Sequence, residues 1–106
     1  MSYADTLAYY IYIMASAKNG SIYIGMTNDL GRRVLEHKTN YNPESHTARY
    51  NIHRLVYYEI FESPGEAIKR EKYLKGKSRK FKINLLETKN SDWVELYEKF
   101  MRGRSI

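Results

Sequence analysis

Aromatic and aliphatic side chains alternate with a period of two residues in two short segments near the beginning of the chain, residues 9–15 (YYIYIMA) and 22–26 (IYIGM). This spacing predicts two β-strands, and the Asn19-Gly20 dipeptide between them is a strong signal for a hairpin turn. We therefore expect an antiparallel pair of strands in this region.

The parity of such a hairpin predicts which side chains share a face of the sheet. When the loop has an even length, even-numbered residues of the first strand and odd-numbered residues of the second project to the same side. Tyr12 and Tyr23 then lie on one face, and Gly25 leaves room beside them. Because tyrosine is also a good strand former whose hydroxyl can sit at a sheet edge, packing alone is the alternative explanation.

The rest of the pattern predicts a third strand and several helices. In order, it indicates a helix over 30–38, a polar loop with one helical turn over 39–53, a strand over 55–61, and helices over 64–75, 78–88 and 92–100. Apolar residues occur at both odd and even positions of the third strand, which favours burial of both of its faces. The order ββα(α)βαα predicts a small three-stranded antiparallel sheet flanked by helices, in the α+β class.

Length and composition limit the classes to which the protein can belong. The 106 residues suit a single domain over 1–106, with a core over about 8–100. The absence of cysteine excludes disulfides, thiolate chemistry and cysteine-ligated metal sites. No leader-like segment or membrane-length apolar stretch occurs, so we expect a cytoplasmic protein. A formal net charge of +6 and a pI near 9.5 favour a polyanionic partner.

The helix over 30–38 carries charged residues on two different sides. At about 100° per residue, His37 falls among the apolar positions and Arg33 falls at their border, whereas Arg32 and Glu36 point the opposite way. Arg33 and His37 are four residues apart and therefore neighbours on the helix surface. The plainer interpretation is an amphipathic helix whose dipole favours a histidine near its C-terminal end.

Glu71 is the most unusual residue of the helix over 64–75. It falls between Ala67, Ile68 and Leu74, in the middle of the predicted apolar stripe. Burying an unpaired carboxylate is costly, so we expect Glu71 to be paired or metal-bound. A salt bridge, for example to Arg33, is one interpretation; a ligand for Mg²⁺, which accepts one or two protein carboxylates and keeps its remaining waters, is the other.

A run of basic residues surrounds the junction of the next two predicted helices. Its members are Lys72, Lys75, Lys77, Arg79, Lys80 and Lys82. Such a run can follow a phosphate backbone, and we select Lys75, Lys77, Arg79 and Lys80 as candidate nucleic-acid-binding residues. A solvated helix face is the alternative.

Four segments taken together, YYIYIM, YIG, NDLGRRVLEH and EAIKREKYLKGKSRKFK, resemble the GIY-YIG nuclease superfamily. They are most similar to its short stand-alone members, which are related to the N-terminal catalytic domain of the excision-repair endonuclease and to certain homing endonucleases. The likeness runs in order from about Tyr9 to Trp93, and its strength lies in the succession of motifs rather than in any one of them.

The resemblance assigns roles to five residues. It implies that Tyr12 is the tyrosine of the first motif, Tyr23 that of the second, Arg33 the helix arginine, His37 its partner and Glu71 the metal-binding glutamate. The fold it implies, a small antiparallel sheet flanked by helices, is the one that the pattern predicts.

Some positions depart from the family pattern. Tyr10 replaces the glycine that names the first motif, and Met26 follows YIG where repair relatives often carry a lysine that helps a tyrosine to ionise. The asparagine late in the family's site matches either Asn84 or Asn90. The additional DNA-binding domain of larger nucleases does not fit in a chain of this length.

The function implied is a metal-dependent endonuclease that acts on DNA or structured nucleic acid with Mg²⁺ or Mn²⁺, in a setting such as DNA repair. Glu71 would hold the cation and Arg33 would stabilise the transition state. Tyr12 or Tyr23 would accept a proton from the attacking water, and His37 would relay that proton or position the substrate. The alternative is a nucleic-acid-binding or adaptor domain that cleaves little by itself, with a protein partner or homodimer supplying further docking surface.

Overall fold

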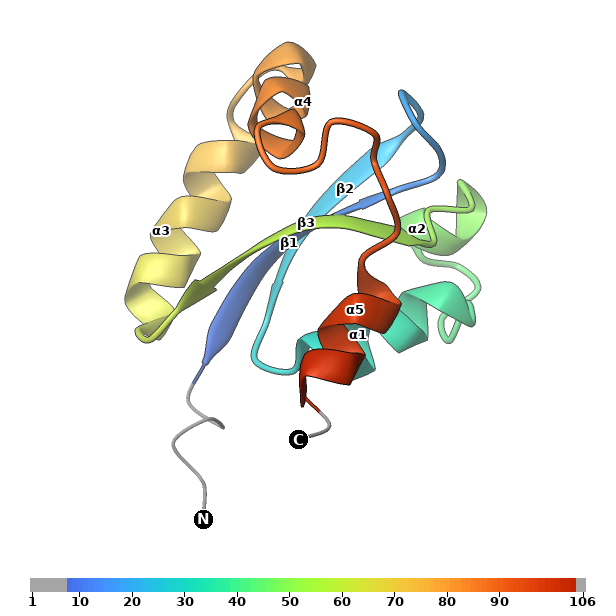
Figure 1. Cartoon of the computed structure of the whole chain (residues 1–106), viewed down its shortest axis with the longest axis horizontal. Helices are drawn as coiled ribbons and strands as arrows, with labels where there is room; N and C mark the ends of the chain where they lie inside the picture. The colour runs from blue at the N-terminus through green and yellow to red at the C-terminus, as the bar shows by residue number, and fades with distance from the viewer. Residues whose placement is uncertain (1–7, 105–106) are drawn as a thin grey trace.

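The computed structural model describes residues 8–104, which form a three-stranded sheet and five helices (Figure 1). Along the chain these are β1 (Tyr9–Ala15), β2 (Ile22–Thr27), α1 (Leu30–Lys38), α2 (His46–Arg49), β3 (Arg54–Phe61), α3 (Pro64–Lys75), α4 (Arg79–Glu87) and α5 (Tyr97–Arg104). This confirms the predicted α+β class, including the single helical turn in the polar loop. None of the helices within the described range is long and apolar enough to cross a membrane.

The sheet has the strand order β2-β1-β3, with both neighbours antiparallel to β1. In the first ladder Tyr12 lies opposite Gly25 and Met14 lies opposite Tyr23. Even positions of β1 therefore face the same side as odd positions of β2, which confirms the predicted parity.

Helices cover both faces of this sheet. On one face, α3 and α4 pack over the core cluster that includes Ile11 and Ile13, together with Trp93. On the other, α1 and α5 pack over a second cluster that includes Tyr12 and Met14. In Figure 1, α3 and α4 lie on the left and top of the sheet, and α1 and α5 lie together at its lower right. The sheet thus separates a layer of aliphatic and mixed aromatic residues from a layer in which most of the aromatic residues are tyrosines.

The third strand departs from the expectation of complete cover. Its first half is buried from Leu55 to Tyr57, but Ile60 near its end is exposed, and Phe61 is only partly buried against the cluster under α3 and α4. Two-sided burial is therefore confined to the first half of β3.

The last helix begins at Tyr97, later than the sequence predicts. Trp93 adopts a left-handed backbone conformation with φ 57°, which is incompatible with a helix that begins at Asp92. The chain turns there because the Trp93 side chain is fully buried and its indole donates a hydrogen bond to Glu87. The first turn of α5 is instead capped by Glu95, whose carboxylate accepts a hydrogen bond from the Tyr97 backbone at 2.8 Å.

Candidate active site

Three predicted site residues meet on the tyrosine-rich face of the sheet. Tyr12 comes from β1, Tyr23 from β2 and His37 from the last turn of α1. The Tyr12 hydroxyl lies 3.0 Å from His37 Nε2, and the ring centroid of Tyr23 lies 6.2 Å from that of Tyr12 and 5.5 Å from that of His37. Two strands and one helix therefore place two phenols and one imidazole in mutual contact.

Gly25 makes this arrangement sterically possible. A Cβ atom at this position would lie 2.6 and 2.9 Å from the Cζ and Cε1 atoms of Tyr12, and closer still to the Tyr12 hydroxyl. These separations are shorter than van der Waals contact, so any side chain on Gly25 displaces the Tyr12 ring. The last residue of the YIG motif is thus required for the space it leaves and not for its backbone conformation.

Thr47 completes the hydrogen bonding of His37, and no pattern in the sequence indicates this role. Its Oγ1 lies 2.8 Å from His37 Nδ1, and 3.2 Å from the hydroxyl of Ser45, the residue that caps α2. Thr47 and His37 are both buried. The neutral imidazole either donates from Nδ1 to Thr47 and accepts from Tyr12, or donates from Nε2 to Tyr12 and accepts from Thr47.

Burial controls the protonation of both groups in the Tyr12–His37 hydrogen bond. It lowers the pKa of His37 to about 4, and the positive charge of Arg33 acts in the same direction, so the imidazole is neutral at pH 7. Burial also raises the pKa of Tyr12 well above that of a free phenol, with a smaller contribution from Tyr23, while Arg33 opposes the rise. Tyr12 is consequently a neutral, buried hydrogen-bonding group at neutral pH.

Arg33 lies at the edge of this cluster, where the helical periodicity placed it. Its guanidinium donates a hydrogen bond to Glu36 at 2.9 Å, and Glu36 also binds Arg32 at 2.7 Å. These hydrogen bonds lower the pKa of Glu36, with that from Arg33 the larger cause. The prediction that Glu36 points away from the site is wrong, because pairing with both arginines draws its carboxylate to the side of Arg33.

Glu71 reaches the same region from α3. Its carboxylate lies 3.2 Å from the ammonium of Lys75, whose Nζ is 5.9 Å from the centroid of the Tyr23 ring. The negative charge of Glu71 also contributes to the raised pKa of Tyr12, as the last of its causes. Glu71 is therefore connected to Tyr23 through Lys75, and its ion-pair partner is Lys75 and not Arg33.

The apolar stripe predicted around Glu71 is narrower than expected. Ala67 and Leu74 are fully buried, but Ile68 is 45% exposed and the Glu71 side chain retains 23% of its accessible surface. Glu71 is thus at the border of the buried stripe, where a carboxylate can meet both protein groups and solvent.

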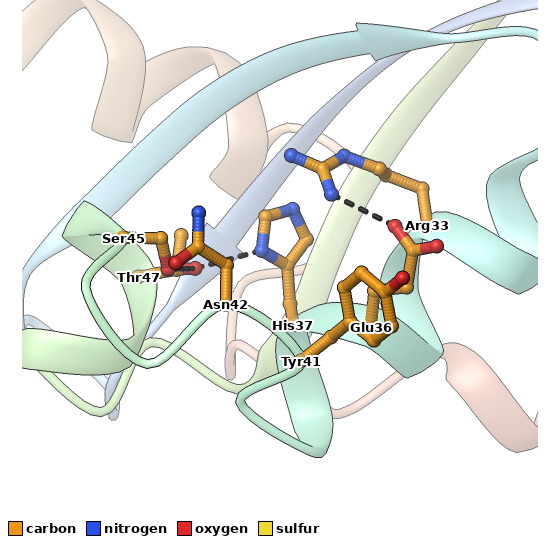
Figure 2. A pocket seen from close by; sticks show the side chains of 7 residues that line it. All are labelled: Arg33, Glu36, His37, Tyr41, Asn42, Ser45 and Thr47. Atoms are coloured by element: carbon orange, nitrogen blue, oxygen red, sulfur yellow. Dashed lines mark hydrogen bonds and ion pairs between the residues drawn. The ribbon is translucent and has the colours of Figure 1, made fainter.

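A small cavity opens beside the cluster (Figure 2). It has a volume of about 170 Å³ and is lined by residues from α1 and from the polar segment that follows it, namely Arg33, Glu36, His37, Tyr41, Asn42, Ser45 and Thr47. Figure 2 shows the Arg33–Glu36 pair and the His37–Thr47 hydrogen bond among these residues. Arg33 and His37 therefore border an open space and are not sealed inside the core.

The predicted basic residues serve different purposes in the structure. Lys75 belongs to the cluster through its contacts with Glu71 and Tyr23. Arg79 donates hydrogen bonds of 3.0 and 2.7 Å to the backbone oxygens of Asn19 and Gly20, so it fixes the β1–β2 turn against α4. Lys80 is exposed, and the ammonium of Lys77 lies over two aromatic rings.

The two candidate asparagines lie outside the cluster's hydrogen-bonding network. Asn84 is an exposed residue of α4. Asn90 is buried, and its amide donates to the backbone oxygens of Val56 and Val94 and accepts from the Val94 nitrogen. Both N–H donors of Asn90 are therefore engaged in holding the segment that leads to α5.

Comparison with known proteins gives a consistent result. A family model described as the GIY-YIG catalytic domain matches residues 8–84. A UPF0213 protein of Clostridium perfringens is 37% identical over 90 residues, covering 85% of this chain and 94% of its own length. A UPF0213 protein of Staphylococcus saprophyticus is 36% identical over 78 residues, covering 74% and 93% of the two chains. The solution NMR structure of a UPF0213 protein from Bacillus halodurans is similar with a TM-score of 0.50 and 34% identity, covering 78% of this chain and 86% of that one.

Proposed function

Because the chain belongs to the GIY-YIG catalytic-domain family of nucleases and is related throughout most of its length to UPF0213 proteins, we propose that it is an endonuclease that hydrolyses phosphodiester bonds of DNA or structured nucleic acid. The observation that carries this proposal is the meeting of Tyr12, Tyr23 and His37 beside an open cavity. Arg33 of α1 lines this cavity, and Glu71 of α3 is connected to Tyr23 through Lys75.

Phosphodiester hydrolysis requires an activated water, stabilised charge on the phosphoryl oxygens and help for the departing oxygen. Arg33 meets the second requirement because its guanidinium is permanently charged and has several donors in one plane. One donor is held by Glu36, which fixes the direction of the guanidinium, and the side chain borders the cavity. In this proposal the remaining donors bind the phosphoryl oxygens.

The residues present fit a divalent cation that retains most of its water. Within residues 8–104 there is no cluster of three or more His, Asp or Glu side chains that would form a closed protein cage. Glu71 is partly exposed and supplies a single carboxylate, which suits Mg²⁺ or Mn²⁺ bound together with a substrate phosphate. When bound there, the cation would supply charge stabilisation at the phosphate and at the leaving oxygen.

The structure favours Tyr23 over Tyr12 as the group that accepts the proton of the attacking water. Tyr12 is 1% exposed and its pKa is raised by burial, so it can neither reach a substrate water nor ionise readily. Tyr23 is partly exposed, and the side chains of His46 and Lys75 lie beside its ring. Lys75 of α3 places a positive charge 5.9 Å from the centroid of the Tyr23 ring, a charge that Met26 does not supply.

Tyr12 and His37 then act by positioning Tyr23 and Arg33. The Tyr12 ring lies between Gly25 and the rings of Tyr23 and His37, and the His37–Thr47 hydrogen bond fixes the imidazole. A buried network with every member satisfied holds its geometry better than isolated side chains do.

The experiment is a cleavage assay on single-stranded, duplex, branched and nicked DNA and RNA with Mg²⁺, Mn²⁺ or EDTA. Glu71→Gln tests the proposed ligand, and Glu66→Gln, an exposed glutamate of the same helix, is the matched control. We expect cleavage by the wild type and by Glu66→Gln, a loss of about a hundredfold or more in Glu71→Gln, and none in EDTA.

The second candidate is a binding or adaptor domain with little cleavage. It is favoured by the ion pair between Glu71 and Lys75, because this pair already engages the carboxylate that is proposed to bind the cation. It becomes the better explanation if the folded wild type cuts none of these substrates but binds them with a strong salt dependence. The DNA-repair setting, the cytoplasmic location and a protein partner or homodimer stay predictions from the sequence.

A further inference from the structure

Two exposed aromatic rings meet at the elbow between α3 and α4, which Figure 1 shows at the upper left of the molecule. Tyr73 of α3 is 47% exposed and Phe81 of α4 is 38% exposed, with ring centroids 6.0 Å apart in an edge-to-face arrangement. The Lys77 ammonium, from the connection between the helices, lies 4.5 Å from the Tyr73 centroid and 5.5 Å from that of Phe81. Two accessible rings beside a cation form a surface that can stack on a planar group while the ammonium binds an anion.

The elbow is also the most basic part of the chain. Residues 69–82 contain eight cations and one acid, Glu71; the cations are Lys69, Arg70, Lys72, Lys75, Lys77, Arg79, Lys80 and Lys82. Three of the eight have polar partners within the protein, because Arg70 binds Glu59 through two hydrogen bonds, Arg79 binds the β1–β2 turn and Lys75 forms an ion pair with Glu71. Lys72, Lys77 and Lys80 are exposed. This charge complements a polyanion rather than an apolar or mixed-charge protein surface.

The aromatic pair and the candidate active site lie on opposite flanks of α3. At 3.6 residues per turn, Tyr73 is about 200° from Glu71 around the helix axis, and Lys72 lies between them on the solvent side. A strand that leaves the cluster at Glu71 and crosses this side would meet Lys72 before the rings. An arc of about 200° around a helix about 10–12 Å in diameter is about 17–21 Å long, which corresponds to about five or six nucleotides at 3.4 Å each.

We propose that the elbow is a second nucleic-acid-binding site, which holds nucleotides that flank the cleaved phosphate. Tyr73 and Phe81 stack on the bases, and Lys72 and Lys77 bind the phosphates between them. Rings that stack on bases without reading their edges give binding that tolerates many sequences. This site rests on the proposed function for its substrate, but it is tested by binding alone.

The test measures binding of fluorescent oligonucleotides in the Glu71→Gln background, with no cleavage required. The ring-deletion variant is Tyr73→Ala with Phe81→Ala; Tyr73→Phe retains the ring, and Ile60→Ala removes an exposed apolar side chain of β3 as the matched control. Each variant is measured on a normal oligonucleotide and on one with abasic nucleotides on either side of its centre. Thermal unfolding establishes that the variants fold.

We expect ring deletion to weaken binding of the normal oligonucleotide about fivefold or more. The protein that retains both rings should bind the abasic oligonucleotide more weakly than the normal one. Ring deletion should not weaken binding of the abasic oligonucleotide any further, because each ring acts only through the base on which it stacks. Lys77→Ala should reduce the slope of log K against log salt by about 0.7, whereas ring deletion leaves this slope unchanged. Tyr73→Phe and Ile60→Ala should bind as before.

Two results would overturn the proposal. One is equal binding of the normal oligonucleotide with and without the rings. The other is an equal loss of affinity, on going from the normal to the abasic oligonucleotide, in the protein with its rings and in the ring-deletion variant. That result would show that the bases contact another surface. An acidic peptide such as oligoglutamate, if it binds and loses affinity on ring deletion while the oligonucleotide does not, assigns the elbow to a protein partner instead. Loss of cleavage activity alone bears on the proposed function and not on this site.

Discussion

Substitution of Gly25 by alanine tests the packing on which the cluster depends. The added Cβ would lie 2.6 and 2.9 Å from two ring carbons of Tyr12, where about 3.5 Å is the normal contact distance. The Tyr12 ring is 1% exposed and cannot move aside without disturbing its neighbours. Overpacking of this kind costs about 1–3 kcal/mol, and loss of the buried Tyr12–His37 hydrogen bond adds about 1–3 kcal/mol.

The expected result for Gly25→Ala is therefore a loss of about 2–6 kcal/mol in the free energy of unfolding, measured by urea denaturation as a lower midpoint at an unchanged slope. Gly65→Ala is the control, because its nearest contact is 3.6 Å away and helix α3 favours alanine at that position. Tyr12→Phe removes the closest of the clashing atoms, so the double variant should lose less than the sum of the two single variants. A Gly25→Ala protein within about 0.5 kcal/mol of the wild type would refute the reasoning.

Three further predictions concern the same site. Thr47→Val should cost about 1–3 kcal/mol in unfolding free energy because it leaves buried His37 Nδ1 without a partner, and Thr47→Ser should restore most of it. The pKa of His37 is about 4 in the folded protein and about 6.5 in the unfolded chain, so as the pH falls the unfolded chain binds the proton first. The contribution of His37 to the free energy of unfolding should be complete above about pH 6.5 and should fall by up to about 3 kcal/mol as the pH drops to 4. His37→Gln should lack this dependence when unfolding is measured over an acid titration. Lys75→Met should lower the single-turnover cleavage rate without unfolding the protein, whereas Lys99→Met, at an exposed position of α5, should not; equal rates in the two would remove Lys75 from the site.

The elements that the sequence predicted correctly are those whose signals are local. The parity of the hairpin follows from the two-residue period and the turn, so the shared face of Tyr12 and Tyr23 was predictable. The helical period likewise placed His37 inward and Arg33 at the border. Their assignment as one site needed the resemblance to a family, because nothing local relates β1 to α3.

Two of the three features that the sequence missed depend on contacts between segments, and the third depends on the direction of one side chain within a helix. Thr47 meets His37 across a polar loop, and a threonine in such a loop has no distinguishing pattern. Glu36 was assigned outward by its helical angle, but a flexible side chain can turn toward two arginines at modest cost. The start of α5 was misplaced because burial of Trp93 imposes a left-handed backbone that the capping signal at Asp92 does not reveal.

The two adjacent arginines of α1 offer the most direct test of the central claim, that phosphodiester hydrolysis takes place at this cluster. Both bind Glu36, but only Arg33 lines the cavity and influences the pKa of Tyr12. The measurement is the single-turnover cleavage rate of Arg33→Ala and Arg32→Ala on the best substrate, at saturating protein. We predict a fall of about a hundredfold or more for Arg33→Ala and a rate close to that of the wild type for Arg32→Ala. Equal rates in the two variants would contradict the assignment of hydrolysis to this cluster.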